Sequence, residues 1–390
     1  MSFDVIICGS GVMGLSTAIL LADLNYSVAL IAPRLPNENP DNPMVHALNP
    51  HAIKLLKQCH IWDQITPAAM THLSITDPYH RIDWSFEAAT CYQPYLSLII
   101  SVSELTYALW TTAQTHSNIQ CYTHVSAEQI DRTTTPITLT LSDNQTLQAP
   151  LVIGADGRNS WLRHQLHCTL LEQATHQKAI VAHVTLEQRL NGCGWQRFLP
   201  TGPLALLPQP DPHQAALIWS LNLDTCEHML EMTSHEFNSA LTEATQSTFG
   251  HCQLSTSRFS YPLTTQISDA FFRTGCVLIG DAAHSIHPVL GQGANLGFLD
   301  IETLIDCIET ARTAGRIWHH DRVLARYQRH RKPDAQCMAH FAHHLNQIAS
   351  KHPAWLGPLS RLGLAIPGVK TTLMRYASGE RFILSSTLHR

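Results

Sequence analysis

The stretch "VLIGDAAHSIHPVLGQGANLGFLDIETL", residues 277–304, decides the fold of this chain. A short apolar strand ends at Asp281, whose carboxylate can accept hydrogen bonds from the hydroxyl groups of a ribose or ribityl chain. The sequence Gly-Gln-Gly at 291–293 then leaves the backbone open to a flat ring, and the next helix points its positive end at the same place. A plain glycine-rich turn before a capped helix would not explain why the carboxylate, the glycines and Asn295 occur together. The stretch therefore predicts a flavin site, since a reduced flavin ring gains from a nearby positive charge.

A second glycine motif lies near the N-terminus, between the apolar runs "FDVIIC" (3–8) and "SVALIA" (27–32). In the pattern GxGxxG, Gly9 makes a tight turn, Gly11 lets a pyrophosphate approach the backbone, and Gly14 lets the helix pack on the strand. The phosphate would meet the free N–H groups at the start of that helix. By itself this motif suits NAD, NADP or FAD.

A third motif, "LVIGADGRNSWLR" at 151–163, follows the same logic of a buried strand that ends in a polar turn. The strand ends at Gly154, and Asp156 and Gly157 come directly after it. Taken alone, these residues favour an ordinary strand-to-helix turn that is capped by the aspartate.

The coarse pattern of the chain is alternating α/β with an inserted antiparallel region. Asn49 before Pro50 predicts a helix start, and "SVSELTYALWTTA" (101–113) offers a capping box before an apolar stripe. The sequence predicts a hairpin that turns at 143–144, and strand-like stretches dominate from about 178 to 264. From about 292 the chain looks helical to the end.

Composition excludes several functional classes. The chain has 390 residues, a formal net charge of -5 and only 14% charged residues, so no basic surface points to nucleic acid. Its 11 cysteines contain no Cys-x-x-Cys pair, which favours free thiols in a reducing compartment. Neither a signal peptide nor an apolar run of about 18 residues occurs. We therefore expect a soluble, cytoplasmic protein.

Histidine is unusually frequent, with 25 residues. The group "HFAHHL" places His340 and His344 on one helical face with His343 beside them, and a metal site there is conceivable. No carboxylate or cysteine stands at ligand spacing nearby, and histidines occur along the whole chain. A compositional bias explains the group better, so no metal is predicted.

The three motifs, in this order and at these separations, resemble the single-component flavoprotein aromatic hydroxylases of the para-hydroxybenzoate hydroxylase fold (class A flavoprotein monooxygenases). The finer resemblance is to the FAD-dependent hydroxylases of ubiquinone biosynthesis in bacteria and mitochondria. It extends to four further stretches, namely "RFLPTGPLALLPQ" (197–209), "YPL" (261–263), "LARYQRHR" (324–331) and "LGLAIPGVKTTLMRYASG" (362–379). The resemblance therefore covers nearly the whole chain.

The resemblance implies an α/β fold, in which a Rossmann-like FAD-binding domain carries an inserted, mostly antiparallel β-sheet substrate domain and a C-terminal helical segment. The implied parts are a discontinuous FAD-binding domain at 1–72, 97–172 and 264–335, a substrate domain at 73–96 and 173–263, and C-terminal helices at 336–390. The inserted sheet would cover the flavin and form the substrate pocket.

The resemblance also assigns roles to the motif residues. Those implied to bind cofactor are Gly9, Gly11 and Gly14 for the pyrophosphate of FAD, Asp156 and Gly157 for FAD and the nicotinamide cofactor, Asp281 for the ribityl chain, and Gly291, Gln292, Gly293 and Asn295 for the isoalloxazine ring. Pro288 would lie on the substrate side of the ring, and His287 beside it could influence substrate protonation. No acid–base dyad stands out elsewhere in the sequence.

The implied activity is that of an FAD monooxygenase, which uses NAD(P)H and O2 to hydroxylate a polyprenylated phenol in ubiquinone biosynthesis. One alternative is the same fold acting on another aromatic or alkene substrate. Another is a non-catalytic member of a ubiquinone-biosynthesis assembly that binds flavin poorly. Residues 351–390 hold six Lys or Arg and only Glu380 as an acid. They pack on the core as an ordinary basic helical pair, or they dock on a membrane surface or a lipid-carrying partner.

The chain departs from the family pattern at the adenosine end of the cofactor. The second strand ends at Ala32, where relatives carry an acid that grips the ribose, and Met44 stands where they carry an arginine that reaches the pyrophosphate. Arg34 would suit an NADP 2′-phosphate, but the 281–293 motif has no role in a nicotinamide dehydrogenase. We therefore expect FAD, held with fewer anchors than usual.

Overall fold

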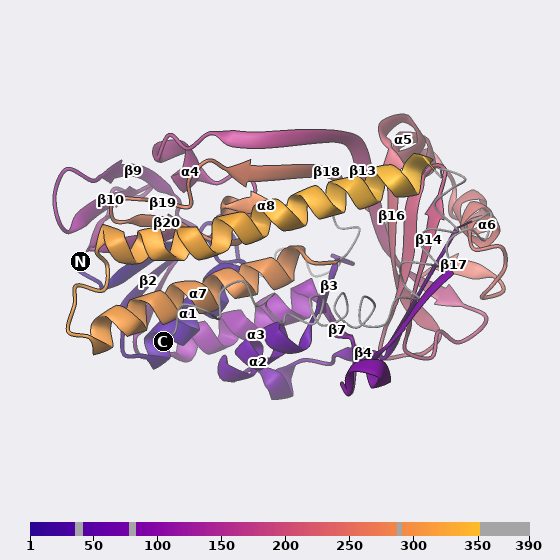
Figure 1. The fold of residues 1–390 in the computed structure, drawn as a ribbon, viewed down its shortest axis with the longest axis horizontal. Helices are drawn as coiled ribbons and strands as arrows, with labels where there is room; N and C mark the ends of the chain where they lie inside the picture. The colour runs from indigo at the N-terminus through magenta and orange to yellow at the C-terminus, as the bar shows by residue number, and fades with distance from the viewer. Residues whose placement is uncertain (36–41, 78–82, 287–290, 352–390) are drawn as a thin grey trace.

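The structure is a computed structural model that describes residues 1–35, 42–77, 83–286 and 291–351. Two sheets lie toward opposite ends of the long axis of the molecule, and the helix α8 (Asp321–Lys351) runs beside both (Figure 1). This arrangement confirms the predicted α/β fold with an inserted, mostly antiparallel sheet.

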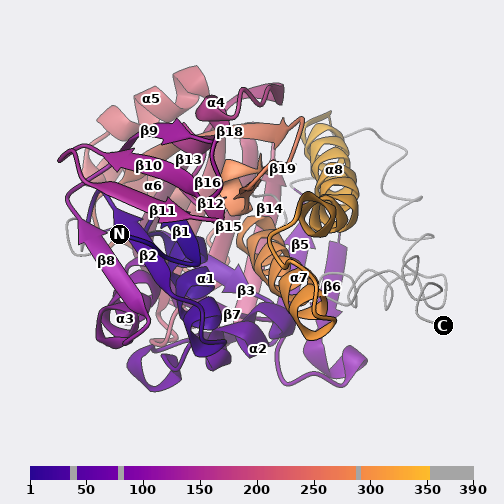
Figure 2. The ribbon, with the colours of Figure 1, turned by 90° about the vertical axis from the view of Figure 1, so that its left-hand side faces the viewer.

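The first sheet has six strands in the order β19 (Phe272–Arg273), β20 (Cys276–Leu278), β12 (Leu151–Gly154), β1 (Val5–Cys8), β2 (Val28–Ala32) and β8 (Ile119–Thr123). All neighbours pair in parallel except β19 with β20. Its central strands are short apolar runs, which suits a sheet that is covered on both faces. Helices α1 (Val12–Asp23), α3 (Val102–Thr115) and α7 (Gly293–Thr313) lie on one side of it, and the small sheet β9 (Ala127–Asp131), β10 (Ile137–Leu141) and β11 (Thr146–Ala149) lies on the other (Figure 2).

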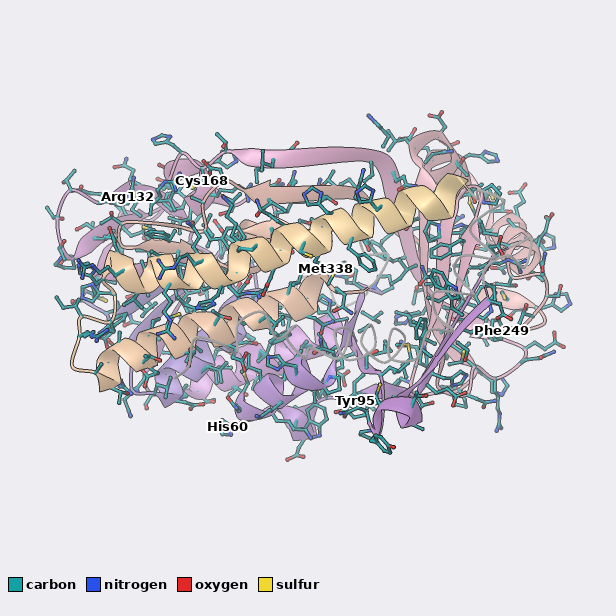
Figure 3. All side chains as sticks on the ribbon, viewed as in Figure 1. His60, Tyr95, Arg132, Cys168, Phe249 and Met338 are labelled. Atoms are coloured by element: carbon teal, nitrogen blue, oxygen red, sulfur yellow. The ribbon has the colours of Figure 1, made fainter. Side chains whose placement is uncertain are left out.

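The second sheet has nine strands and is antiparallel except where β14 pairs with β5. Its main order is β21 (His284–Ser285), β18 (Phe259–Ser268), β13 (Leu170–Leu186), β16 (Gln214–Asn222), β15 (Gly202–Pro208), β14 (Cys193–Leu199), β5 (His72–Thr76) and β6 (Asp83–Glu87), and β17 (Cys252–Leu254) pairs with β13. Helices α5 (Leu223–Glu231) and α6 (Ser234–Ala244) cover its outer face. The ring of Phe249, labelled in Figure 3, packs edge-on against Trp195 at 5.5 Å in that outer core.

Two long strands join the two sheets. β13 has 17 residues and β18 has 10; they pair antiparallel, so β13 runs from the first sheet toward the second and β18 runs back (Figure 1). The predicted domain boundaries at 172/173 and 263/264 fall inside these strands, so the division of the chain into domains stays a prediction. α8 likewise passes through the predicted boundary at 335/336 as one helix with Pro333 inside it.

A second three-stranded sheet lies between the two larger ones and brings β3 (Val45–Leu48) next to the Gly-Gln-Gly motif. It contains β3, β7 (Ser97–Ser101) and β4 (Ala68–Met70). Two short elements complete the cofactor region, namely α4 (Trp161–Gln165) and the 3₁₀ turn η4 (Gly280–Ala282).

The local signals in the sequence are mostly confirmed. α2 (Pro50–Gln58) begins as predicted, because the Asn49 side chain accepts a hydrogen bond from the backbone of the first turn. The hairpin turns as predicted between β10 and β11. The capping box at α3 forms only in half: Ser101 accepts from the Glu104 N–H, but the Glu104 carboxylate accepts from the Thr66 N–H at 2.8 Å instead.

Within the described ranges the structure shows neither a metal-binding cluster nor a membrane-spanning helix. No group of three or more histidine, cysteine or acidic side chains there is arranged to hold a metal ion. No helix in those ranges has both the length and the apolar character needed to cross a membrane.

Candidate active site

Three neighbouring strands of the six-stranded sheet carry the three sequence motifs to one edge. Gly9 follows β1, Asp156 follows β12, and Asp281 lies in η4 just after β20. The carboxyl ends of parallel strands meet at the same edge of a sheet, which is where ligands bind in this architecture. Contacts agree with this placement, because a Cβ built on Gly280 would lie 3.0 Å from the Cγ atom of Met13 in the GxGxxG motif.

The glycines of the GxGxxG motif occupy three different environments. Gly9 has φ +114°, and a Cβ there would lie within 2.8 Å of the backbone of Ala155 and Asp156. A Cβ on Gly14 would lie within 3.0 Å of the carbonyl group of Gly9. A Cβ on Gly11 would meet no described atom within 4 Å. The outer glycines therefore close the strand–helix corner, and the middle one borders open space at the start of α1.

The turn after β12 is fixed by its own polar side chains. Asp156 Oδ2 accepts a hydrogen bond from the Leu162 N–H at 3.0 Å, and Ser160 accepts from the Arg163 N–H at 3.0 Å, so both side chains cap α4. Burial raises the pKa of Asp156, although hydrogen bonds to Ser160 and to the backbone oppose the shift. Gly157 has φ +79° and borders open space in the described structure. Within the protein, Asp156 therefore acts as the cap of an ordinary strand-to-helix turn, which is what the motif favours when taken alone.

Arg163 links this turn to the η4 turn. It is 2% exposed and donates to the Ala282 carbonyl at 3.0 Å and to the Arg158 carbonyl at 2.7 Å. The Arg158 guanidinium in turn donates to the Pro262 carbonyl in β18 at 2.9 Å. The two cofactor turns and the nine-stranded sheet are therefore tied together by two arginines.

Asp281 is exposed to solvent, although the surrounding protein desolvates its carboxyl. Its carboxyl is accessible to solvent, yet desolvation by the surrounding protein raises its pKa, against the opposing charges of His284 and Arg158. Tyr261 lies near enough that burial and the Asp281 charge together raise the pKa of its hydroxyl to about 12. An accessible but partly desolvated carboxylate gains from hydrogen-bond donors on a ligand, such as hydroxyl groups.

The Gly-Gln-Gly loop is tied to β3 through Asn295. This side chain is 3% exposed, accepts from the Asn49 N–H at 2.9 Å, and donates to the carbonyls of Ala47 at 3.0 Å and Gly291 at 3.2 Å. Its amide therefore serves the protein by fixing the loop, and a direct contact with a flavin stays a prediction. Gly291 has φ +62°, which favours glycine at this position.

Space for a ligand opens at the start of α7. A Cβ on Gly293, the first residue of α7, would meet no described atom within 4 Å. In the described structure the N-cap residues of α1 and α7, Gly11 and Gln292, make no side-chain capping hydrogen bond to the first turn of their helix. Two helix N-termini without an N-cap side-chain bond thus border the same sheet edge, one suited to phosphate and one to the electron-rich edge of a ring. These residues fit FAD.

The remaining positions near the site add little to the picture of how a ligand would be held. His287 and Pro288 lie outside the described residues. Ala32 is fully buried and offers no contact to a ligand, whereas Met44 is half-buried. His46, which the sequence analysis did not single out, lies on β3 beside Ala47, and burial lowers its pKa to about 4.

The sequence reasoning missed the buried charges behind this site. His284, Asp300 and Arg331 form a cluster in which no member is more than 2% exposed. All three lie in stretches that resembled the family, 277–304 and 324–331. The available signal was Asp300, an acid inside the apolar run "LGFLDI" (296–301), whereas Arg331 lies among polar residues and gave none.

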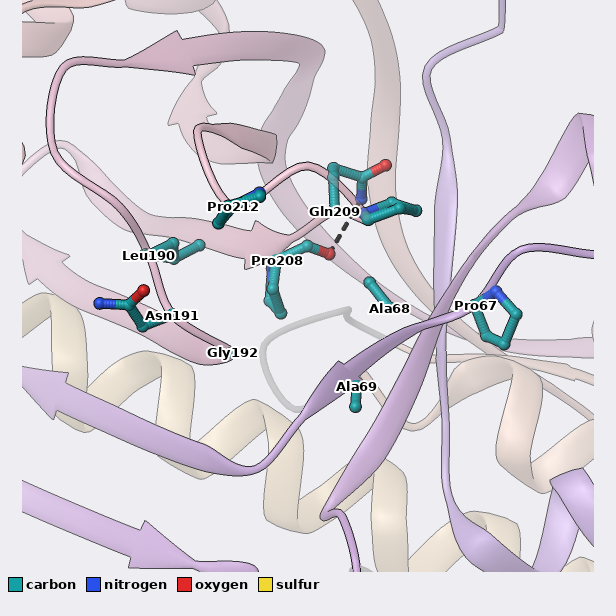
Figure 4. A pocket seen from close by; sticks show the side chains of 10 residues that line it. Pro67, Ala68, Ala69, Leu190, Asn191, Gly192, Pro208, Gln209 and Pro212 are labelled. Carbon is teal, nitrogen blue, oxygen red and sulfur yellow. Dashed lines mark hydrogen bonds between the residues drawn. The ribbon is translucent and has the colours of Figure 1, made fainter.

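A surface pocket of about 340 Å³ lies away from these motifs (Figure 4). It is lined by Pro67, Ala68, Ala69, Leu190, Asn191, Gly192, Pro208, Gln209, Pro210 and Pro212. This lining carries no titratable side chain, so the pocket offers no acid–base chemistry.

Comparison with known proteins agrees with the cofactor that the geometry fits. The family model described as "FAD binding domain" matches residues 2–342. The chain is 30% identical over 344 residues to the 3-demethoxyubiquinol 3-hydroxylase of Escherichia coli, covering 85% of this chain and 86% of the relative. It is 28% identical over 389 residues to the ubiquinone hydroxylase UbiL of Rhodospirillum rubrum, covering 96% and 89%.

A solved structure supports the fold. The P. aeruginosa protein PqsL, in complex with 2-aminobenzoylacetate, superposes with a TM-score of 0.78 at 19% identity, covering 92% of this chain and 100% of that chain. With the family model matching most of its length and a relative at 30% identity, the chain belongs to the FAD binding domain family, and its cofactor is FAD.

Proposed function

We propose that this protein is an FAD-dependent monooxygenase that uses NAD(P)H and O2 to hydroxylate the aromatic ring of a polyprenylated phenol in ubiquinone biosynthesis. The observation that carries the proposal is the convergence of three motifs on one sheet edge, with an accessible carboxylate at Asp281 and two uncapped helix starts. The substrate class is supported by the names of two relatives, a 3-demethoxyubiquinol 3-hydroxylase and a ubiquinone hydroxylase.

The cofactor-binding residues of the proposal are those of the motifs, namely Gly9, Gly11, Gly14, Asp156, Gly157, Asp281, Gly291, Gln292, Gly293 and Asn295. Bound FAD supplies the redox chemistry, in which electrons from NAD(P)H activate O2 so that one oxygen atom enters the ring and the other leaves as water. The protein binds and orients. Asp281 accepts hydrogen bonds from ligand hydroxyl groups, and the start of α7 stabilises negative charge on a ring beside it.

The nine-stranded sheet supplies an apolar face for the substrate. Leu204, Leu206 and Trp219 point to the outer core under α5 and α6. Because side chains alternate along a strand, Ala205 and Ile218 point to the opposite face, toward the first sheet, where both stay partly exposed. Apolar, partly exposed side chains there would hold a prenylated ring and exclude water from the reacting atoms.

We further propose that residues 351–390 dock on an anionic membrane surface or on a lipid-carrying partner, because a polyprenyl tail does not leave the bilayer unaided. The support is compositional: six basic residues against one acid in this part of the sequence. Flotation with anionic liposomes at low salt tests the membrane version, and absence of binding would leave only the partner version.

The experiment that tests the function follows oxygen. Purified protein, supplied with FAD, NADH or NADPH and isotope-labelled O2, is given phenols with short prenyl tails. We expect one labelled oxygen atom in the product by mass spectrometry, and nucleotide oxidation that speeds up when the phenol is present. Accumulation of one unhydroxylated quinone precursor after deletion of the gene would identify the natural substrate.

The matched variants are Asp281→Ala, at the proposed site, and Asp224→Ala, at an exposed carboxylate on α5. The first should lose both flavin and product, and the second should keep both. Normal flavin content without labelled product from any phenol would reject this substrate class. Failure to take up FAD at all would point to a non-catalytic member of the assembly.

A further inference from the structure

Asp300 lies at the centre of a buried ion cluster directly behind the η4 turn. It is fully buried on α7, and its Oδ1 atom accepts a hydrogen bond from Arg331 Nε at 2.8 Å. Its Oδ2 atom accepts from the Gly280 N–H at 2.9 Å and lies 2.6 Å from His284 Nε2. One carboxylate thus engages both ends of the segment that carries Asp281.

The chemistry of the cluster fixes its protonation. Burial opposes ionisation of Asp300, but the charges of His284 and Arg331 and their hydrogen bonds outweigh it, so the pKa of this carboxyl is lowered. Because an ionised carboxylate only accepts hydrogen bonds, His284 carries its proton on Nε2. A buried carboxylate with three donors is a satisfied group, whereas the same group without one donor is strongly penalised.

The cluster joins three elements at the cofactor turn. Arg331 belongs to α8 and also donates to the Leu296 carbonyl at 3.3 Å, so it holds α8 on the first turns of α7. From the opposite side, Arg163 donates to the Ala282 carbonyl at 3.0 Å. The segment 280–284 is therefore held at Gly280, Ala282 and His284, which leaves the Asp281 side chain to meet a ligand.

We infer that Asp300, His284 and Arg331 are positioning residues for FAD, which hold the η4 turn so that the Asp281 carboxylate is already in place before the cofactor binds. Their burial keeps all three away from a ligand, so they act only through the turn. A turn that is ordered in advance does not have to be ordered on binding, and this raises affinity. The inference rests on the proposed role of Asp281.

The experiment compares two substitutions of His284 in the full-length protein. Gln keeps an amide N–H that reaches Asp300, and Leu removes it. We expect His284→Leu to raise the Kd for FAD about tenfold or more, and His284→Gln to leave it within about threefold of the wild type. Kd is measured by titrating apoprotein with FAD and following flavin fluorescence, with the absorption bands of bound flavin as a second readout. If His284→Leu does not fold, His284→Asn replaces it, because its shorter amide does not reach Asp300.

Tyr26→Phe is the matched control. Tyr26 is 4% exposed and donates to Glu309 at 2.9 Å on the far part of α7, so its loss removes a partly buried hydrogen bond from that helix. We expect this variant to lower the melting temperature of the apoprotein and to keep the Kd for FAD within about threefold. A merely structural cluster would behave in the same way as the control.

Two outcomes overturn the inference. One is a Kd within about threefold of the wild type in His284→Leu, or in His284→Asn where that variant replaces it. The other is an equal loss of affinity in His284→Gln. Asp281→Ala, measured in parallel, separates the two levels: if it binds FAD normally, the proposed role of Asp281 fails first, and if it alone loses FAD, only the positioning role fails.

Discussion

Gly11→Ala should weaken FAD binding and Gly14→Ala should destabilise the fold, although the two residues stand three positions apart in one motif. A methyl group on Gly11 projects into space that is free of described atoms within 4 Å. A methyl group on Gly14 would lie within 3.0 Å of the carbonyl group of Gly9, whereas carbon atoms prefer a separation of about 3.5–4.0 Å. The first change therefore tests the ligand space, and the second tests the packing of α1 on β1.

For Gly11→Ala we expect little change in apoprotein stability. Gly11 is the N-cap of α1 with φ −78° and ψ 179°, an extended conformation that alanine adopts without strain. The loss of a favoured N-cap residue and the smaller entropy of the unfolded chain oppose each other, so the net effect is within about 1 kcal/mol. If the pyrophosphate of FAD passes over Gly11, the added methyl group should weaken FAD by about 1–3 kcal/mol, or about 10- to 100-fold in Kd.

For Gly14→Ala we expect the reverse order of effects. The clash is with backbone, which has no side-chain rotation to relieve it, and overpacking of this kind costs about 1–3 kcal/mol or more. Urea unfolding of each apoprotein and titration with FAD measure the two quantities separately. Wild-type affinity for FAD in Gly11→Ala would refute the reasoning, because it would mean that the cofactor does not occupy the space beside the middle glycine.

Four further expectations concern the same site and its surroundings. Because the pKa of Asp281 is raised in the folded protein, its protonated form stabilises the fold, and this stabilisation is lost as pH rises through the raised pKa. Asp281→Asn should therefore raise the melting temperature of the apoprotein at neutral pH but not at acidic pH, while FAD binding falls. The pKa of Asp300 is lowered, so its contribution is present above the unfolded pKa of about 3.9 and is lost as pH falls through the lower folded value, and Asp300→Asn should flatten the acid limb of the stability curve. The wild type should purify partly as apoprotein, and added FAD should restore colour and raise the melting temperature; stoichiometric FAD that resists dialysis would contradict this expectation. Met44→Arg should tighten FAD binding, whereas Ala32→Glu should destabilise the protein because Ala32 is fully buried. The pKa of Tyr261 is about 12, so its hydroxyl stays protonated near neutral pH. The Kd for FAD should therefore depend on pH in the same way in Tyr261→Phe and in the wild type near neutral pH.

Much of the fold was accessible from the sequence, because it depends on local signals. Asn49 before Pro50 predicts the start of α2 whatever surrounds it, and apolar runs followed by glycine predict the parallel strands that bring the motifs to one edge. The fate of polar side chains was not accessible in the same way. Glu104 has the spacing of a capping box, but Thr66, which is distant in the sequence, competes for its carboxylate.

The same limit applies within the site. The sequence places Asn295 beside the glycines and so predicts that it lines the flavin, but its amide is engaged by Asn49, Ala47 and Gly291. Which partner such a side chain chooses depends on β3, whose approach to α7 is a tertiary contact that no local pattern encodes. Spacing identifies the residues of a turn, and only the packed structure separates those that face a ligand from those that hold the turn.

The helix α8 shows why some residues hold the cofactor turn while others face the ligand. A turn that presents an accessible, partly desolvated carboxylate is unfavourable by itself, so it needs stabilising contacts from elements that do not touch the ligand. α8 provides one through Arg331, which binds Asp300, and Asp300 in turn binds the η4 turn at Gly280. Farther along, α8 packs against β14 and β15 of the nine-stranded sheet. Met338, on the same helix, is 4% exposed and belongs to the main core (Figure 3). Because one continuous helix touches both the cofactor turn and the sheet proposed to bind substrate, the relative placement of the two is set by a rigid element and not by the loops between them.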